Sequence, residues 1–102
     1  MNMNIQNLMR EAQKMQKDLE KTQKELERTE YEGNSSFVTV ILNGNKELKS
    51  LKIDFNDKLD GKDDIEMLED LIVVAFNEAI KKVDADKNKK LGKYGNGLSG
   101  LM

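Results

Sequence analysis

Two groups of basic residues in this 102-residue chain have a spacing that suggests binding of an anionic ligand. The first group recurs at intervals of three and four, which places it on one stripe of a helix: Arg10, Lys14, Lys17, Lys21, Lys24 and Arg28. The second group is a cluster near the C-terminus: Lys81, Lys82, Lys87, Lys89 and Lys90. Rows of cations can contact the phosphates of a polyanion, and the excess of lysine over arginine favours contact with charge over recognition of bases.

The ordinary explanation of such charged rows is structural, and it stays open beside phosphate contact. Acids at helical spacing offer the N-terminal stripe four local ion pairs: Glu11 with Lys14, Asp18 with Lys21, Glu20 with Lys24, and Glu25 with Arg28. The C-terminal lysines would likewise complement the negative end of a helix dipole.

Residue types that support catalysis or metal binding are missing or badly spaced. The chain has no cysteine and no histidine, which removes disulfides, thiolate ligands and the commonest general base. Asp60 and Asp63 flank Gly61, but the segment lacks the alternating ligands and the closing glutamate of an EF-hand loop. We expect no enzymatic activity, no catalytic residue, no metal site, no cofactor and no small-molecule substrate.

Charge is unevenly distributed, although the formal net charge is only −2. From Asp54 to Asp70 there are eight acids against two lysines, whereas from Lys81 to Lys93 there are six lysines against two acids. A polyanion would therefore meet the lysine-rich ends and avoid the acidic middle.

Length and composition predict one domain over residues 1–91 and a flexible glycine-rich tail over 92–102. No apolar run approaches the ~20 residues of a membrane span, and the N-terminus lacks the apolar core of a signal peptide. We expect a cytoplasmic protein that has no membrane partner.

Helix signals lie at both ends of the predicted domain. Good helix formers without proline or glycine predict a helix over residues 4 to about 27. A polar loop over 57–62 precedes a second helix, which either Asp63 or Asp64 could cap. The second helix carries a wide apolar stripe suited to lying on a sheet: Leu68, Leu71, Ile72, Ala75, Phe76, Ala79, Ile80 and Val83.

Strand signals fill the middle of the chain. Turn residues over 33–36 precede a β-rich run that predicts a strand over 37–42. A hairpin at 43–45 leads to a returning strand over about 47–55. Because two strands alone are marginal, we expect a third, short strand around 29–33. The side chains of the returning strand that face inward are expected to be Leu51, Ile53 and Phe55.

Apolar and small residues of the first helix form a narrow seam with heptad spacing, and they make self-association the favoured prediction: Ile5, Leu8, Ala12, Met15, Leu19, Thr22, Leu26 and Thr29. Part of this seam could instead cover the chain's own sheet. Met9 lies beside the seam, and Val73 and Val74 widen the apolar surface of the second helix. We predict a dimer interface at Ile5, Leu8, Met9, Ala12, Met15, Leu19, Val73 and Val74.

The order of residues resembles the YbaB/EbfC family of bacterial nucleoid-associated proteins over nearly the whole chain. The resemblance rests on Asn7-Leu8-Met9-Arg10-Glu11-Ala12-Gln13-Lys14-Met15-Gln16-Lys17, Tyr31-Glu32-Gly33, Val38-Thr39-Val40-Ile41-Leu42-Asn43-Gly44, Ile53-Asp54, Leu68-Glu69-Asp70-Leu71, Ala75-Phe76-Asn77-Glu78-Ala79 and a glycine-rich end.

The resemblance implies a two-layer α+β fold, in which a long helix, three antiparallel strands and a second helix form a homodimer. It also implies duplex DNA as partner, a location in the nucleoid, and effects on DNA conformation, nucleoid organisation and gene expression. The residues that it favours for DNA binding are Arg10, Lys14, Lys17, Lys81, Lys82, Lys87, Lys89 and Lys90, to which the basic stripe adds Lys21. A small adaptor that binds a protein and has no affinity for DNA stays the alternative.

Overall fold

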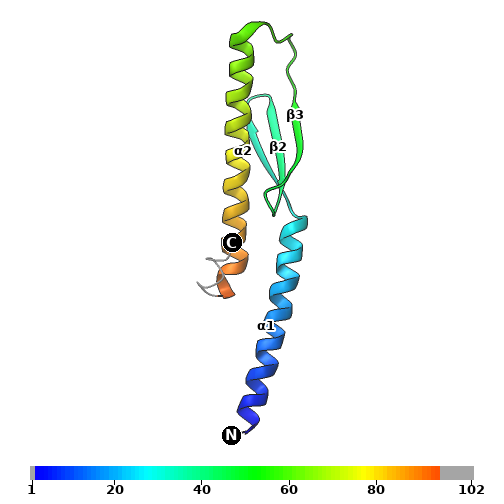
Figure 1. The fold of residues 1–102 in the computed structure, drawn as a ribbon, viewed down its shortest axis with the longest axis vertical. Helices are drawn as coiled ribbons and strands as arrows, with labels where there is room; N and C mark the ends of the chain where they lie inside the picture. The colour runs from blue at the N-terminus through cyan, green and yellow to red at the C-terminus, as the bar shows by residue number, and fades with distance from the viewer. Residues whose placement is uncertain (1, 95–102) are drawn as a thin grey trace.

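The computed structural model describes residues 2–94, of which the side chains are described from Asn4 onward. The elements are α1 (Asn2–Arg28), β1 (Glu30–Ser35), β2 (Val38–Asn43), β3 (Leu48–Ile53), α2 (Gly61–Leu91) and the 3₁₀ turn η1 (Gly92–Tyr94). This order confirms the predicted α+β fold. Of the predicted tail, Gly92–Tyr94 form the 3₁₀ turn, and 95–102 lie outside the described residues. The molecule measures 76 × 20 × 14 Å because α1 projects beyond the rest of the chain (Figure 1).

The core lies between α2 and one face of an antiparallel sheet with strand order β1-β2-β3. Val38, Val40 and Leu42 alternate along β2 toward the helix and are fully buried. Small residues bring the two layers into close contact: a Cβ atom at Gly33 of β1 would lie 1.9 Å from the carbonyl oxygen of Ala75. The wide apolar stripe predicted for the second helix is therefore the stripe that packs on the sheet.

Strand β3 departs from the prediction, because its apolar side chains are not covered. Ile53 and Leu51 pair across the sheet with Val38 and Val40, so they point toward the α2 side. However, α2 packs on β1 and β2, and Leu51 and Ile53 stay 43% and 40% exposed. Phe55 is half-buried against the Phe37 ring, with 4.6 Å between ring centroids, and Phe37 packs against the core. The predicted inward orientation was right in direction for Leu51 and Ile53, but no element among residues 2–94 covers them.

Two element boundaries also differ from the sequence prediction. Strand β1 is a full six-residue strand, and the first turn lies at Ser36 and Phe37, not over 33–36. Helix α2 begins at Gly61, two residues before Asp63 and three before Asp64, the predicted caps; Gly61 has a φ of +80°, a left-handed value that favours glycine where the loop enters the helix. The Asp64 carboxylate acts from inside the helix and accepts a hydrogen bond of 2.8 Å from the Asp60 backbone N–H.

Helix α1 extends away from the two layers as an arm (Figure 1). Every side chain from Asn4 to Asp18 is exposed, Leu19 and Thr22 are half-buried, and only Leu26 is buried. At about 1.5 Å per residue, the 27-residue helix is roughly 40 Å long. The heptad seam therefore has two parts, a short C-terminal part that packs within the chain and a longer N-terminal part that meets solvent.

Candidate nucleic-acid interface

The basic stripe of α1 is an exposed row of unpaired cations. Arg10, Lys14, Lys17 and Lys21 are exposed, and the uninterrupted helix keeps them on one side of the arm. Four ion pairs occur among residues 2–94, and none of them involves α1. The local pairs that would have braced the stripe are thus not formed. Lys17, Lys21, Lys24 and Arg28 line a shallow hollow of about 360 Å³ together with Glu20 and Glu25.

The lysine cluster of α2 is divided between held and unpaired side chains. Lys82 donates a 2.6 Å hydrogen bond to the Glu32 carbonyl oxygen and pairs with Glu78 at 3.5 Å. Lys90 pairs with Asp86 at 3.0 Å. Lys81, Lys87 and Lys89 take part in none of the four ion pairs found in the described part of the chain. Of these three, Lys81 and Lys89 are exposed and Lys87 is half-buried, so Lys81 and Lys89 are the most available cations of the cluster.

Lys90 belongs to a network that ties the first strand to the end of α2. The Tyr31 hydroxyl donates a 2.5 Å hydrogen bond to the Asp86 carboxylate, which also pairs with Lys90. Burial, and then the hydrogen bond to Asp86, raise the pKa of Tyr31 to about 12. The same hydrogen bond, with help from Lys90 and Lys89, lowers the pKa of Asp86. Asp86 therefore stays ionised and holds Lys90.

The short turn that follows α2 lies beside the middle of the arm, so Lys93 comes close to one residue of the basic stripe. Lys93 and Tyr94 of η1 line a hollow of about 350 Å³ with Lys14, Met15 and two acids of α1, Glu11 and Asp18. The Lys93 ammonium lies 5.1 Å from the centre of the Tyr94 ring. The acidic N-terminal turns of α2 lie at the opposite end of the molecule (Figure 1). The fold thus separates the charges in space as the sequence separates them along the chain.

Comparison with known proteins assigns this arrangement to a family. The model of the YbaB/EbfC DNA-binding family matches residues 1–98. The chain belongs to the YbaB/EbfC DNA-binding family. It is 44% identical to a nucleoid-associated protein of Clostridium botulinum (strain Eklund 17B / Type B) over 99 residues, which cover 95% of this chain and 86% of that protein. It is 43% identical to a nucleoid-associated protein of Xylella fastidiosa (strain Temecula1 / ATCC 700964), covering 94% and 89%, and 41% identical to one of Mycoplasmopsis pulmonis (strain UAB CTIP), covering 81% of each.

Membership of the YbaB/EbfC family confirms the resemblance read from the sequence, and it places the chain among nucleoid-associated DNA-binding proteins. Within residues 2–94, no group of three or more acidic, histidine or cysteine side chains is arranged to hold a metal ion. None of the helices in this part of the chain is long and apolar enough to cross a membrane.

The predicted interface residues are exposed in the single chain, apart from half-buried Leu19. The exposed fractions of Ile5, Leu8, Met9 and Met15 lie between 55% and 63%, and those of Val73 and Val74 are 57% and 53%. The arm residues and the valines occupy different elements, so the chain displays two apolar surfaces. The uncovered β3 side chains Leu48, Leu51 and Ile53 add to this exposed apolar area.

Sequence reasoning assigned Lys93 and Tyr94 to the tail, whereas the structure places them against the arm. Lys93 ends the run of six lysines that begins at Lys81, so its charge was visible in the sequence. Its proximity to Lys14 was not visible, because it depends on the antiparallel path of α2 beside α1 (Figure 1).

Proposed function

We propose that this protein is a homodimeric DNA-binding protein of the nucleoid, and that it contacts the phosphates of duplex DNA through the arm and the adjoining end of α2. The observation that carries the proposal is the arm itself: a helix of roughly 40 Å whose cations have no ion-pair partner among residues 2–94. Duplex DNA carries about one charge per 1.7 Å of axis, so such a row can meet several phosphates.

Homodimer formation is supported by the apolar side chains that one chain leaves in solvent. Large contiguous apolar patches are rare on monomeric proteins. A second copy that covers the N-terminal seam, Val73 and Val74, or the open β3 side chains would remove them from water. Dimerisation would also double the number of cations and join two weak DNA sites, which raises avidity without new contacts.

A role in DNA conformation, nucleoid organisation and gene expression belongs to this proposal. Its support is the naming of the Clostridium, Xylella and Mycoplasmopsis relatives as nucleoid-associated proteins. Contacts made mainly by lysine to phosphate carry little sequence information, so we expect similar affinity for duplexes of unrelated sequence.

The decisive experiment is a DNA-binding titration at two salt concentrations, combined with the mass of the particle in solution. We expect a dimer that binds duplex DNA with an affinity that falls steeply between about 50 and 200 mM salt, because counterions are released on binding. A salt-independent affinity would overturn the phosphate mechanism. A particle that does not bind DNA and co-purifies with a protein in a salt-insensitive manner would favour the adaptor alternative.

The lysine cluster is tested separately. Replacing Lys81, Lys82, Lys87, Lys89 and Lys90 by glutamate should weaken binding to all duplexes alike. Unchanged binding by this variant would leave the α1 stripe as the DNA contact and remove α2 from the proposed interface.

A further inference from the structure

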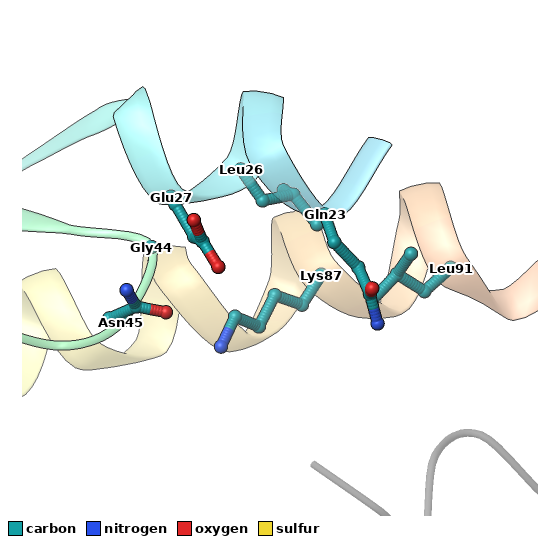
Figure 2. Close-up of a pocket in the computed structure, with 7 residues that line it drawn as sticks. All are labelled: Gln23, Leu26, Glu27, Gly44, Asn45, Lys87 and Leu91. Atoms are coloured by element: carbon teal, nitrogen blue, oxygen red, sulfur yellow. The ribbon is translucent and has the colours of Figure 1, made fainter. Parts of the chain in front are cut away.

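The base of the α1 arm is held in a joint formed by three elements. A single residue, Thr29, separates α1 from β1, and its backbone N–H and hydroxyl donate hydrogen bonds of 3.0 and 2.7 Å to the Glu25 carbonyl oxygen in the last turn of α1. The C-terminal turns of α1 enclose a cleft of about 220 Å³ with the β2–β3 hairpin and the end of α2 (Figure 2). Leu26 of α1 and Leu91 of α2 line this cleft, and each is only 2% exposed.

Gly44 in the hairpin makes the closest approach in this joint. A Cβ atom at Gly44 would lie 2.0 Å from the carbonyl oxygen of Leu26 and 2.5 Å from its carbonyl carbon. In this hairpin the residue with a positive φ is Lys46, at 64°, and Gly44 does not have one. Glycine is therefore required at this position because the backbone of the arm approaches so closely, and not because the turn needs its conformational freedom.

The hairpin that presents Gly44 is itself fixed to the body of the protein. The Asn43 side-chain oxygen accepts hydrogen bonds from the backbone N–H groups of Asn45 and Glu47, at 2.9 and 3.0 Å. Lys46 pairs with Asp84 of α2 at 3.0 Å. These contacts hold the hairpin in place, so it resists displacement by the arm.

We propose that Gly44 and Leu26 are positioning residues, which set the direction of the arm and thereby the placement of its cations on DNA. The inference rests on the proposed function, because only a DNA-bound arm makes its direction matter. A small tilt at the base becomes a displacement of several Å at the tip of a helix roughly 40 Å long. A displaced arm would no longer reach all of its phosphates at the same time, and avidity depends on that simultaneous binding.

The test is Gly44→Ala, with Gly92→Ala as matched control. Gly92 has no atom within 4 Å of the position where a Cβ would stand, so the same methyl group is harmless there. The chain has no native cysteine, and the exposed residues Gln13 of α1 and Asn77 of α2 can be replaced by cysteine for spin labelling. Dilution with unlabelled protein restricts the measured distance to one chain.

In the unaltered protein and in Gly92→Ala we expect one narrow distance between the labels. In Gly44→Ala we expect a shifted or broadened distribution, a Kd for duplex DNA weakened by about tenfold, and a shallower dependence of Kd on salt because fewer phosphates are neutralised. A mere loss of folded protein would lower the active fraction and leave the salt dependence unchanged. If Gly44→Ala does not fold, Leu26→Ala frees the arm without adding atoms, and the same three results are expected.

An unchanged distance distribution would overturn the inference, and so would a changed distribution with unchanged Kd and salt dependence. Failure of the proposed function looks different: the unaltered protein would not bind DNA at any salt concentration, whether or not Gly44→Ala moves the arm.

Discussion

Helices α1 and α2 have similar lengths and both carry apolar residues at helical spacing, yet their surroundings differ. Helix α2 buries Ala75, Ala79 and Val83 completely against the sheet. From Asn4 onward, helix α1 buries only Leu26; Leu19 and Thr22 are half-buried, and the N-terminal part of the seam meets solvent. The same kind of periodicity therefore marks a contact within the chain in one helix and a surface left open in the other.

The lysine and arginine side chains of the two helices also differ in their surroundings. On α2, Lys82 donates a hydrogen bond to the Glu32 carbonyl oxygen of the neighbouring strand, whereas Lys90 pairs with Asp86 of the same helix, whose carboxylate also accepts a hydrogen bond from Tyr31 of β1. On α1, within the described part of the chain, no neighbouring element offers such acceptors, and the stripe stays free of ion pairs. A helix that stands apart from the core can keep its charges available for a ligand.

The largest expected effect is on the free energy of unfolding, which should respond strongly to a substitution in the core and weakly to one in the arm. Leu42→Ala removes a fully buried side chain and should lower the free energy of unfolding by about 3 kcal/mol. Leu8→Ala, at a side chain 63% exposed, should change it by less than about 0.5 kcal/mol under conditions where the chain is monomeric. Denaturant titrations at low protein concentration measure both values. Equal losses would mean that the arm packs on the body in solution.

The second prediction concerns the unpaired cations of the arm. Replacing Arg10, Lys14, Lys17 and Lys21 by glutamine should weaken duplex binding about 10²-fold at moderate salt and reduce the salt slope by about 0.9 for each phosphate that is no longer neutralised. The control carries the same charge change at exposed lysines away from both basic groups: Lys49, Lys52, Lys58 and Lys62. Fluorescence anisotropy across a salt series gives both quantities. Equal effects in the two variants would show that total charge, and not the arm, controls binding.

The third prediction concerns the stability that Tyr31 contributes while it is buried and hydrogen-bonded to Asp86. Because the pKa of Tyr31 is raised from 10.0 to about 12 in the folded protein, the unfolded chain loses this proton first as pH rises. Stability due to Tyr31 is therefore complete below pH 10 and is lost as pH approaches 12, on the order of 2 kcal/mol in all. Denaturation of the unaltered protein and Tyr31→Phe between pH 9 and 12 measures the difference, which should shrink as pH rises. A constant difference would show that burial and the Asp86 hydrogen bond do not raise the pKa of Tyr31.

The smallest expected effect is on DNA affinity, and it distinguishes lysines of α2 that form an ion pair from lysines that do not. Lys89→Gln should weaken DNA binding by about threefold, as expected for one exposed phosphate contact at moderate salt. Lys90→Gln should have less effect, because Asp86 already holds Lys90. Asp86→Asn, which loosens that hold, should raise the effect of Lys90→Gln to that of Lys89→Gln. Anisotropy at one salt concentration suffices, and a larger loss for Lys90→Gln in the original background would contradict the assignment.

Local patterns in the chain were sufficient to predict most of the fold. The β-rich run of β2, the hairpin around Gly44 and the stripe of α2 each reflect short-range geometry, so both helices and two strands were found from local patterns, whereas β1 was predicted because two strands alone are marginal. The start of α2 was missed because glycine usually signals a loop, whereas Gly61 occupies the first helical position with a positive φ. The full length of β1 was missed because Gly33 and Asn34 resemble turn residues, although Gly33 is required where the strand meets α2.

The amino-acid order alone established the two helices, the hairpin at 43–45, the segregation of charge and the absence of cysteine and histidine, because these depend on composition and on neighbours a few residues apart. The fold of residues 2–94 was needed to learn that Leu51 and Ile53 stay uncovered by this part of the chain, that Tyr31 of β1 contacts Asp86 of α2, and that Gly44 supports the arm. Each of these depends on which distant segments approach one another, and the spacing of residues along a chain does not specify such long-range contacts.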